Sequence, residues 1–273
     1  MYIINYCSGG LGNRLKPIGS CSLIAKQLNR KLGIYWPSTM RCMGKFKNLF
    51  LNPIEEINID ELNSDDVVIY SEPSYIIHDA NLNNFFGLLN LYNKIGCLPI
   101  EQVENLDISK KYAIVYNNTV LPKYGDIDNF IKSLNPIKKL NDVITNFVKV
   151  NKIDKSVIGI HARSTDFTNS NIKSYKQFVD SLLTDSPNIK ILFCSDDLEW
   201  ECQMYYEYPN NIIIREKKDI VKKFDATKSW LNNAHTSELA VQEAIIDMYL
   251  LSKTNFLVYN TDSTFAHLVN YLK

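Results

Sequence analysis

The pattern of apolar and polar positions predicts buried strands and amphipathic helices in the first half of the chain. Short apolar runs predict strands at residues 2–7, 32–36, 67–70, 75–78 and 113–116. A helical pattern covers about residues 14–30, and its apolar face consists of Leu15, Ile18, Cys21, Ala25 and Leu28. The opening strand, helix and second strand therefore predict a β-α-β unit.

The second half shows the same alternation more regularly. Strands are predicted at residues 156–161, 189–194, 211–214 and 255–259, and helices at about 173–184, 197–205, 237–251 and 263–272. This alternation predicts a parallel sheet covered on both faces, and such sheets bind ligands at the carboxyl ends of their strands. Pro136 begins a further helix. The polar connection 150–155 predicts a boundary between domains 1–150 and 151–273.

Composition excludes several classes of protein. The 273 residues are 45% hydrophobic and 22% charged, which excludes global disorder and fits two domains. The 30 lysines and arginines balance the 30 aspartates and glutamates, and this zero net charge argues against a nucleic-acid partner. The sequence contains no apolar run of about 18 residues and does not open on a secretion signal. We therefore expect no transmembrane segment and a cytoplasmic location.

The cysteines do not indicate a metal site. The six cysteines are scattered without a C-x-x-C pair, and the four histidines lie far from any such pair. We expect reduced thiols and no zinc site.

A glycine-rich segment follows the first predicted strand and opens the first helix. It contains Gly10 and Gly12, followed by Asn13 and Arg14. Glycines allow a backbone to approach a ligand closely, and the N–H groups at a helix start favour an anion. The segment lacks the third glycine of a dinucleotide-binding motif, so a tight structural turn is an equally good interpretation.

An arginine and an aspartate follow the predicted strand at 156–161. His161 ends this strand, and Arg163 and Asp166 come directly after it. A guanidinium at a strand end can bind a diphosphate with two parallel hydrogen bonds, and Asp166 could orient it or accept a proton. The alternative is a structural pair of Arg163 and Asp166, with His161 in the core.

Adjacent carboxylates end the next predicted strand. Asp196 and Asp197 could bind a ribose, a base or a metal, and either one could instead cap the following helix. They do not form an Asp-x-Asp pair, so a metal that bridges a diphosphate is not indicated.

The last helices carry further polar side chains. Glu243 and Asp247 lie four residues apart on one helix face, and two carboxylates on a mostly apolar helix need partners or water. A carboxylate would suit guanine, which presents two neighbouring N–H donors. Ser263 and Thr264 begin a helix after a strand, where they could hold a phosphate or cap the helix.

Together these segments resemble the fucosyltransferase superfamily, which includes protein O-fucosyltransferases, α-1,6-fucosyltransferases and nodulation-type enzymes. The similar segments are residues 9–15 and 25–36 for the N-terminal motif, 158–166 for the H-x-R motif, 193–197 for the central acidic motif, and 246–252 with 263–265 for the last motif. Residues 38–135 do not align with the family.

The resemblance implies an α/β fold of the GT-B type, with two Rossmann-like β/α/β domains that face a central cleft. It implies a nucleotide-sugar donor on the second domain and a glycan or protein acceptor on the first. Transfer would be inverting and would need no metal or other cofactor, and GDP-fucose is the donor that the family suggests. Arg163 would stabilise the leaving diphosphate, with Asp166 as the nearest carboxylate for catalysis. The residues implied in donor binding are Gly10, Gly12, Asn13, Arg14, His161, Asp196, Asp197, Asp247, Ser263, Thr264 and Phe265.

Two departures from the family leave alternatives open. Ser164 stands where some relatives carry a second arginine, and residues 168–171 lack the acidic base that some relatives place there. The alternatives are a GT-B transferase with another donor such as UDP-xylose, and a catalytically degenerate protein that binds a nucleotide sugar. The acceptor would be selected by residues 38–135 and by the loop at 216–235.

Overall fold

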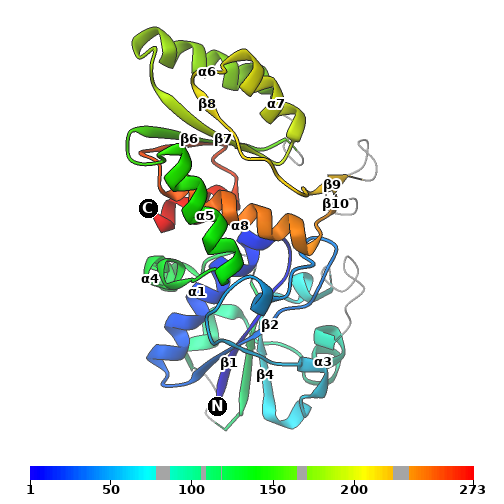
Figure 1. Cartoon of the computed structure of the whole chain (residues 1–273). Helices are drawn as coiled ribbons and strands as arrows, with labels where there is room; N and C mark the ends of the chain where they lie inside the picture. Colours follow the sequence, from blue (N-terminus) through cyan, green and yellow to red (C-terminus); the bar gives the residue numbers. More distant parts are fainter. Residues whose placement is uncertain (78–86, 106–108, 118, 165–170, 224–233) are drawn as a thin grey trace. The chain divides into compact units, whose positions relative to one another are not determined.

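The chain folds into two units, each with its own parallel sheet (Figure 1). The computed structural model describes residues 1–77, 87–105, 109–117, 119–164, 171–223 and 234–273. The first unit contains residues 1–47 and 51–135, and the second contains residues 48–50 and 136–273.

The sheet of the first unit has five parallel strands in the order β3-β2-β1-β5-β4. They are β1 (Tyr2–Tyr6), β2 (Lys31–Tyr35), β3 (Glu55–Glu56), β4 (Val67–Tyr70) and β5 (Tyr112–Val115). The helices are α1 (Leu11–Gln27), α3 (Gly87–Ile95) and α4 (Asp128–Ser133). Short 3₁₀ turns lie at η1 (Phe46–Asn48), η2 (Ile59–Glu61), η3 (Ser64–Asp66), η4 (Ile100–Asn105) and η5 (Pro122–Tyr124).

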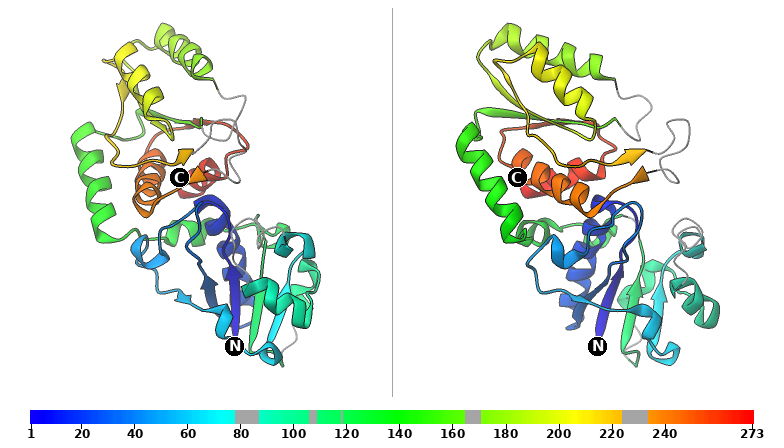
Figure 2. Two further views of the ribbon diagram at one scale, coloured as in Figure 1. Left: turned by 90° about the vertical axis from the view of Figure 1, so that its right-hand side faces the viewer. Right: turned by 45° about the vertical axis from the view of Figure 1, so that its right-hand side comes forward.

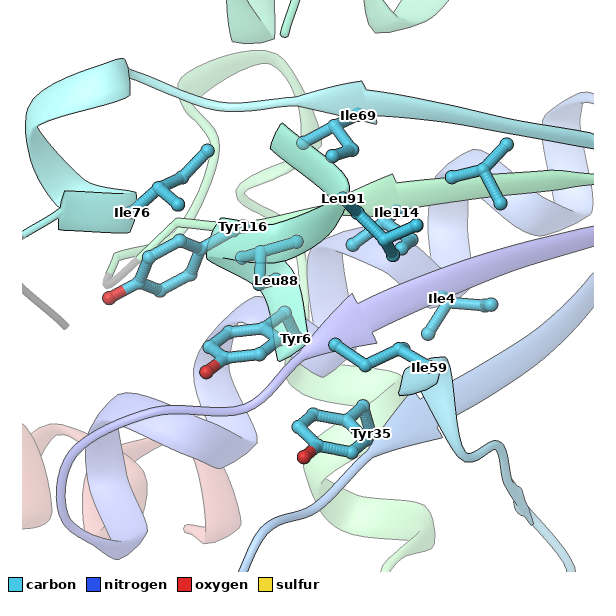
Figure 3. Packing of buried hydrophobic residues seen from close by; sticks show 11 residues of the cluster. Ile4, Tyr6, Tyr35, Ile59, Ile69, Ile76, Leu88, Leu91, Ile114 and Tyr116 are labelled. Carbon is cyan, nitrogen blue, oxygen red and sulfur yellow. The ribbon is translucent and has the colours of Figure 1, made fainter. Parts of the chain in front are cut away.

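Both faces of this sheet are covered because successive side chains of a strand point to opposite sides. Ile3 of β1 packs in the cluster that contains Ile24 of α1. Ile4, the next residue, packs in the cluster that contains Leu88 and Leu91 of α3. Figure 3 shows this second cluster, in which side chains of β1, β2, β4 and β5 meet those of α3.

The sheet of the second unit has four parallel strands in the order β11-β6-β7-β8. They are β6 (Val157–Ala162), β7 (Lys190–Ser195), β8 (Ile212–Ile213) and β11 (Leu257–Tyr259), and β9 (Lys222–Lys223) forms a separate antiparallel pair with β10 (Ala234–His235). The helices are α5 (Lys138–Asn151), α6 (Ile172–Asp185), α7 (Leu198–Glu207), α8 (Glu238–Ser252) and α9 (Thr264–Leu272).

Helices cover both faces of this sheet as well (Figure 2). On one face, Val179 of α6 and Met204 of α7 pack against Ile160 and Phe193 of the central strands. On the other face lie α8 and α9, and α5 packs against α8. Gly159 of β6 permits the close approach of the chain that follows α8, because an added Cβ would lie 2.6 Å from Thr254 Oγ1.

Most predicted elements are confirmed to within a few residues, and one is wrong. A strand was expected at 75–78, but residues 73–77 are helical and begin at Pro73. Ile76 from this turn packs in the cluster shown in Figure 3. A short apolar run fits a buried helical turn as well as a strand, which explains the error. The predicted loop at 216–235 also contains β9 and β10.

The boundary between the units differs from the predicted one. The sequence placed it after residue 150, in the polar connection, whereas the structure divides the units at residues 135 and 136. The reason is that α5 packs against α8 and so belongs to the second unit. Residues 48–50 join that unit too, and Phe50 pairs there with Pro136.

The packing of α1 against the chain before α4 generates a test of stability. A Cβ added at Gly19 would lie 2.7 Å from Cβ of the fully buried Ile127. We expect Gly19→Ala to lower the free energy of unfolding by about 1–3 kcal/mol through overpacking, despite the better helix propensity of alanine. Urea unfolding measures the change. Lys26→Ala, at an exposed position of the same helix, is the control and should be nearly neutral. A Gly19→Ala variant as stable as the wild type would contradict this account of the packing.

Candidate functional site

The carboxyl ends of three strands meet at one edge of the second sheet. In the parallel register, His161 of β6 lies opposite Cys194 of β7 and Tyr259 of β11. The segments that leave these strands carry the polar residues that the sequence singled out. The structure therefore brings the H-x-R motif and the acidic motif to the same edge, together with the strand that leads to α9.

Arg163 lies at this edge and is tied to the neighbouring turn. Its side chain is 21% exposed, and its Nε lies 4.0 Å from Oδ2 of Asp196. The Ser164 N–H donates to Oδ1 of Asp196 at 2.7 Å, and the Ser164 hydroxyl donates to Asp197 at 3.0 Å. The turn after β6 is thus fixed on the turn after β7. Asp166 lies outside the described residues, so its role stays a prediction.

Asp197 serves as a helix cap. Its Oδ1 accepts hydrogen bonds from the N–H groups of Glu199 and Trp200, and its Oδ2 accepts the one from Ser164. Capping was one of the two interpretations that the sequence left open, and the structure shows it for Asp197. Asp196 is then the carboxylate of this pair that lies nearest to Arg163.

The end of β6 also contacts the start of α9. The rings of His161 and Phe265 lie with their centres 4.6 Å apart and their planes tilted by 30°, and both side chains are buried. Ser263 caps α9 by accepting a hydrogen bond from the N–H of Ala266, and Thr264 begins the helix. The side chain of Ser263 is therefore used by the helix, while the first-turn N–H groups are of the kind that binds anions.

A buried network of five charged side chains lies behind the same edge. Arg215 and Lys217 follow β8, and they form ion pairs with three carboxylates, those of Glu201 in α7 and of Glu243 and Asp247 in α8. Arg215 bonds to Glu243 and reaches Asp247 at 2.9 Å. Lys217 bonds to Glu201 and reaches Asp247 at 2.8 Å.

Within the network, the pKa values of Glu201 and Lys217 are raised and that of Asp247 is lowered. Burial raises the pKa of Glu201 to about 7, because the lost hydration outweighs the attraction of Lys217. Burial would raise the pKa of Asp247 too, but Lys217 and Arg215 more than offset it and hold that pKa below its ordinary value. The pKa of Lys217 is raised, since its carboxylate partners outweigh the effect of burial.

Asp247 was expected to contact the guanine end of a donor, and the structure gives it a different set of partners. Its two oxygens are held by Arg215 and Lys217, and it is 6% exposed. The structure thus places Asp247 in an internal network of charges. Its contact with a guanine base stays a prediction.

Sequence reasoning missed Arg215, Lys217 and Glu201. One signal was present, since Glu243 and Asp247 on an apolar helix required partners. The partners of Glu243 and Asp247 lie about 30 residues away along the chain, so spacing could not identify them. The pattern of two cations directly after a short apolar strand was the only local indication.

The glycine-rich turn of the first unit is held by Arg14. Gly9 has a positive φ of 73°, and α1 begins at Leu11 after Gly10. The guanidinium of Arg14 donates to the carbonyl oxygens of Gly9 and Pro37 and to the Thr39 hydroxyl. Its carbon Cζ lies 4.8 Å from the ring centre of Trp36.

The sequence suggested Arg14 as a donor-binding residue, and the structure shows its guanidinium hydrogen-bonded within its own unit. It is fully buried, and the groups that it contacts belong to its own unit. Its role is to lock the turn after β1 against the segment after β2. Gly12 lies buried in the first turn of α1, and Asn13 is half-buried. Oδ1 of Asn13 has no hydrogen-bond partner among the described residues.

An open hollow lies at the carboxyl end of β2 and β3 in the first unit. It is lined by Trp36, Ser38, Lys45, Lys47, Ile54 and Glu56. The indole N–H of Trp36 donates to the carbonyl oxygen of Gly44 at 2.7 Å, which fixes the ring. The hollow combines charges of both signs with the buried indole of Trp36, and the other residues of its lining fall in the part of the chain that does not align with the family.

Three further observations concern the described residues. The six cysteines all lie in described segments and form no disulfide there. Within the described residues, histidine, cysteine and acidic side chains do not gather in threes around a possible metal position. None of the helices seen there is both long enough and apolar enough to cross a membrane.

Comparison with solved structures identifies the fold. NodZ α-1,6-fucosyltransferase co-crystallised with GDP superposes with a TM-score of 0.61 at 13% identity, over 98% of this chain and 91% of that one. Fucosyltransferase NodZ from Bradyrhizobium gives 0.59 at 14% identity, over 98% and 91%. POFUT1 in complex with GDP-fucose gives 0.59 at 12% identity, over 99% and 94%.

The chain has the fold of these fucosyltransferases. No protein-family model and no curated protein matches the sequence. The α/β, GT-B-like fold that the motifs implied is therefore confirmed by structure at an identity that leaves only scattered residues in common.

The buried network predicts a specific dependence of stability on pH. A raised pKa means that Glu201 takes up protons on folding, so its contribution is present below its ordinary pKa of 4.5 and is lost as pH rises through about 7. Between pH 5 and pH 8, we expect the free energy of unfolding of the wild type to fall by up to about 3 kcal/mol relative to that of Glu201→Gln. Urea unfolding at a series of pH values measures the difference. Glu199→Gln, on the exposed side of the same helix, should follow the wild type. The prediction would be contradicted if the free energies of unfolding of the wild type and of Glu201→Gln changed with pH in the same way.

Proposed function

We propose that the protein is a glycosyltransferase that transfers fucose from GDP-fucose to a hydroxyl group of a glycan or a protein. The observation that carries the proposal is Arg163, a partly exposed guanidinium at the carboxyl end of β6, oriented by Asp196. It lies in a fold shared with fucosyltransferases solved with GDP and GDP-fucose.

The proposed reaction is a single displacement with inversion at the anomeric carbon. An acceptor oxygen forms the new bond, the bond to the diphosphate oxygen breaks, and its electron pair leaves with GDP. Arg163 and the first-turn N–H groups of α9 would stabilise the negative charge that develops on the diphosphate. Because these groups supply positive charge themselves, we propose that no metal is required. Asp166 is the proposed acceptor of the hydroxyl proton.

The two units would divide the substrates. We propose that the second unit binds the donor, with Thr264 near the phosphates and with His161 and Phe265 near the nucleoside. Asn13 and the backbone at Gly10 and Gly12 would approach the sugar and phosphate from the first unit. The first unit would hold the acceptor, and the hollow beside Trp36 supports this because its serine, lysine and glutamate side chains can hydrogen-bond to sugar hydroxyls.

The donor can be identified by a nucleotide screen. We expect GDP to raise the melting temperature selectively over UDP, CMP and ADP, since a ligand at a hundred times its dissociation constant stabilises the folded state by about 2.7 kcal/mol. Differential scanning fluorimetry measures the shift. Selective stabilisation by UDP would instead support a transferase with a UDP-sugar donor. Binding of GDP without release of GDP from GDP-fucose in the presence of a mixed glycan acceptor would support a degenerate binding protein.

The role of Arg163 is tested by substitution. We expect Arg163→Ala to reduce the rate of GDP release from GDP-fucose by about 10²–10³-fold, the usual effect of losing one donor to a developing anion. The rate of Arg163→Lys should lie between those of the wild type and Arg163→Ala, because lysine keeps the charge but not the forked geometry. Lys173→Ala, at an exposed position of α6, is the control. A turnover of Arg163→Ala within a few-fold of the wild type would overturn the assignment.

A further inference from the structure

We propose that Lys217 is a positioning residue for Arg163, and that it acts through the backbone of Ser195 and the carboxylate of Asp196. This inference rests on the proposed function, because it takes Arg163 to contact the donor diphosphate. Lys217 belongs to no motif of the family resemblance, and its ammonium group contacts the last residue of β7.

Lys217 is fully engaged inside the second unit. Its side chain is 2% exposed. Its ammonium group donates to the carbonyl oxygen of Ser195 and contacts the carboxylates of Glu201 and Asp247. An ammonium group has three hydrogens to donate, and these three acceptors match that number.

The residue that Lys217 contacts is the last one of β7. The N–H of Ser195 donates to Oε1 of Glu201 at 2.8 Å, and its hydroxyl accepts a hydrogen bond from the N–H of Asp197 at 3.1 Å. The ammonium group of Lys217 donates to the carbonyl oxygen of Ser195. Both backbone polar groups of Ser195 are therefore held by side chains of the buried network. This clamp fixes the direction in which the chain leaves β7, and Asp196 is the next residue.

The side chain of Asp196 connects the end of β7 to the turn after β6. Its Oδ1 accepts the N–H of Ser164, and its Oδ2 lies 4.0 Å from Nε of Arg163. A displacement of the Asp196 carboxylate would move the turn that carries Arg163. A misplacement of about 1 Å in a catalytic group can cost on the order of 10² in rate.

The position of Lys217 is itself set by α8. Arg215 bonds to Glu243, and the N–H of Lys218 donates to Glu243 at 3.0 Å. Asp219 accepts the hydroxyl of Ser237, the residue that caps α8. The segment 215–219 is thus fastened along this helix. Apolar side chains of the same size often stabilise a fold as well as a buried ion pair does, so a role in geometry accounts better for these charges than stability alone.

Lys217→Met tests the proposal, with Lys218→Met as a matched control. Lys218 is the adjacent lysine, and it is exposed. The first readout is the ¹⁵N–¹H signal of the Arg163 Nε–H group, assigned by its loss in Arg163→Ala. We expect this signal to shift in Lys217→Met and to stay unchanged in Lys218→Met. Asp196→Ala should shift the same signal, and adding Lys217→Met to it should change the signal no further.

Kinetics supply the second readout. We expect Lys217→Met to lower kcat for GDP release from GDP-fucose by about 10–100-fold, with a smaller change in KM. Lys217→Arg should recover part of the rate, since it retains a cation that can donate to the Ser195 carbonyl oxygen. If Lys217→Met does not fold, Glu201→Gln carries the test at pH 8, where the wild-type carboxyl group is ionised. It keeps the acceptor for Ser195 and removes the charge that holds Lys217.

The outcomes separate this inference from the proposed function. A wild type that releases no GDP from GDP-fucose overturns the proposed function, and the Arg163 signal then still reports on the clamp. A folded Lys217→Met, or Glu201→Gln in its place, with an unchanged Arg163 signal and unchanged kcat overturns the inference. A rate loss in Lys217→Met that Lys218→Met shares also overturns it.

Discussion

The parallel pairing of β6 with β7 and β11 is the constraint on which the candidate site depends. It places His161 beside Cys194 and Tyr259, so three chain segments leave the sheet at one edge. Side chains alternate along a strand, and a slip of one residue would exchange the faces to which they point. The hydrogen bonds that Ser164 donates to Asp196 and Asp197 depend on the register that the buried apolar residues select. The core of the second unit therefore determines the chemistry at its edge.

The buried charges extend this dependence to the helices behind the sheet. A charged group removed from water is costly unless it is paired, and each of the five charges in the network has a partner of opposite sign. The pairs join α7, α8 and the segment after β8 to the end of β7. An edge made of loops alone would be free to rearrange. Here side chains of the network hydrogen-bond to both the N–H and the carbonyl oxygen of Ser195. Through them, α7 and α8 restrict the movement of the turn that carries Asp196.

The sequence predicted the elements well because both cores are strongly patterned. Strand alternation and helical faces placed β1, α1 and the whole of the second sheet close to their observed limits. The sequence did not predict the helical turn at residues 73–77 or the boundary at residue 135. Both depend on which surface an apolar face packs against. The described parts of the H-x-R and acidic motifs lie at one edge of the second sheet. The partners of Asp247 could not be foreseen, because Arg215 lies 32 residues away and no spacing rule connects them.

Two arginines show why residue type and position in a strand–turn–helix unit do not suffice to assign a phosphate-binding role. Arg14 and Arg163 both follow a central strand, and the sequence suggested a ligand for both. Arg14 is fully buried, and backbone carbonyls, a hydroxyl and an indole ring of its own unit surround it. Arg163 keeps part of its surface open and faces a carboxylate at 4.0 Å, a distance that orients a guanidinium without covering it. What distinguishes a structural arginine from a candidate catalytic one is thus the set of acceptors that the fold supplies. That set is decided by tertiary packing, so it becomes visible only in the structure.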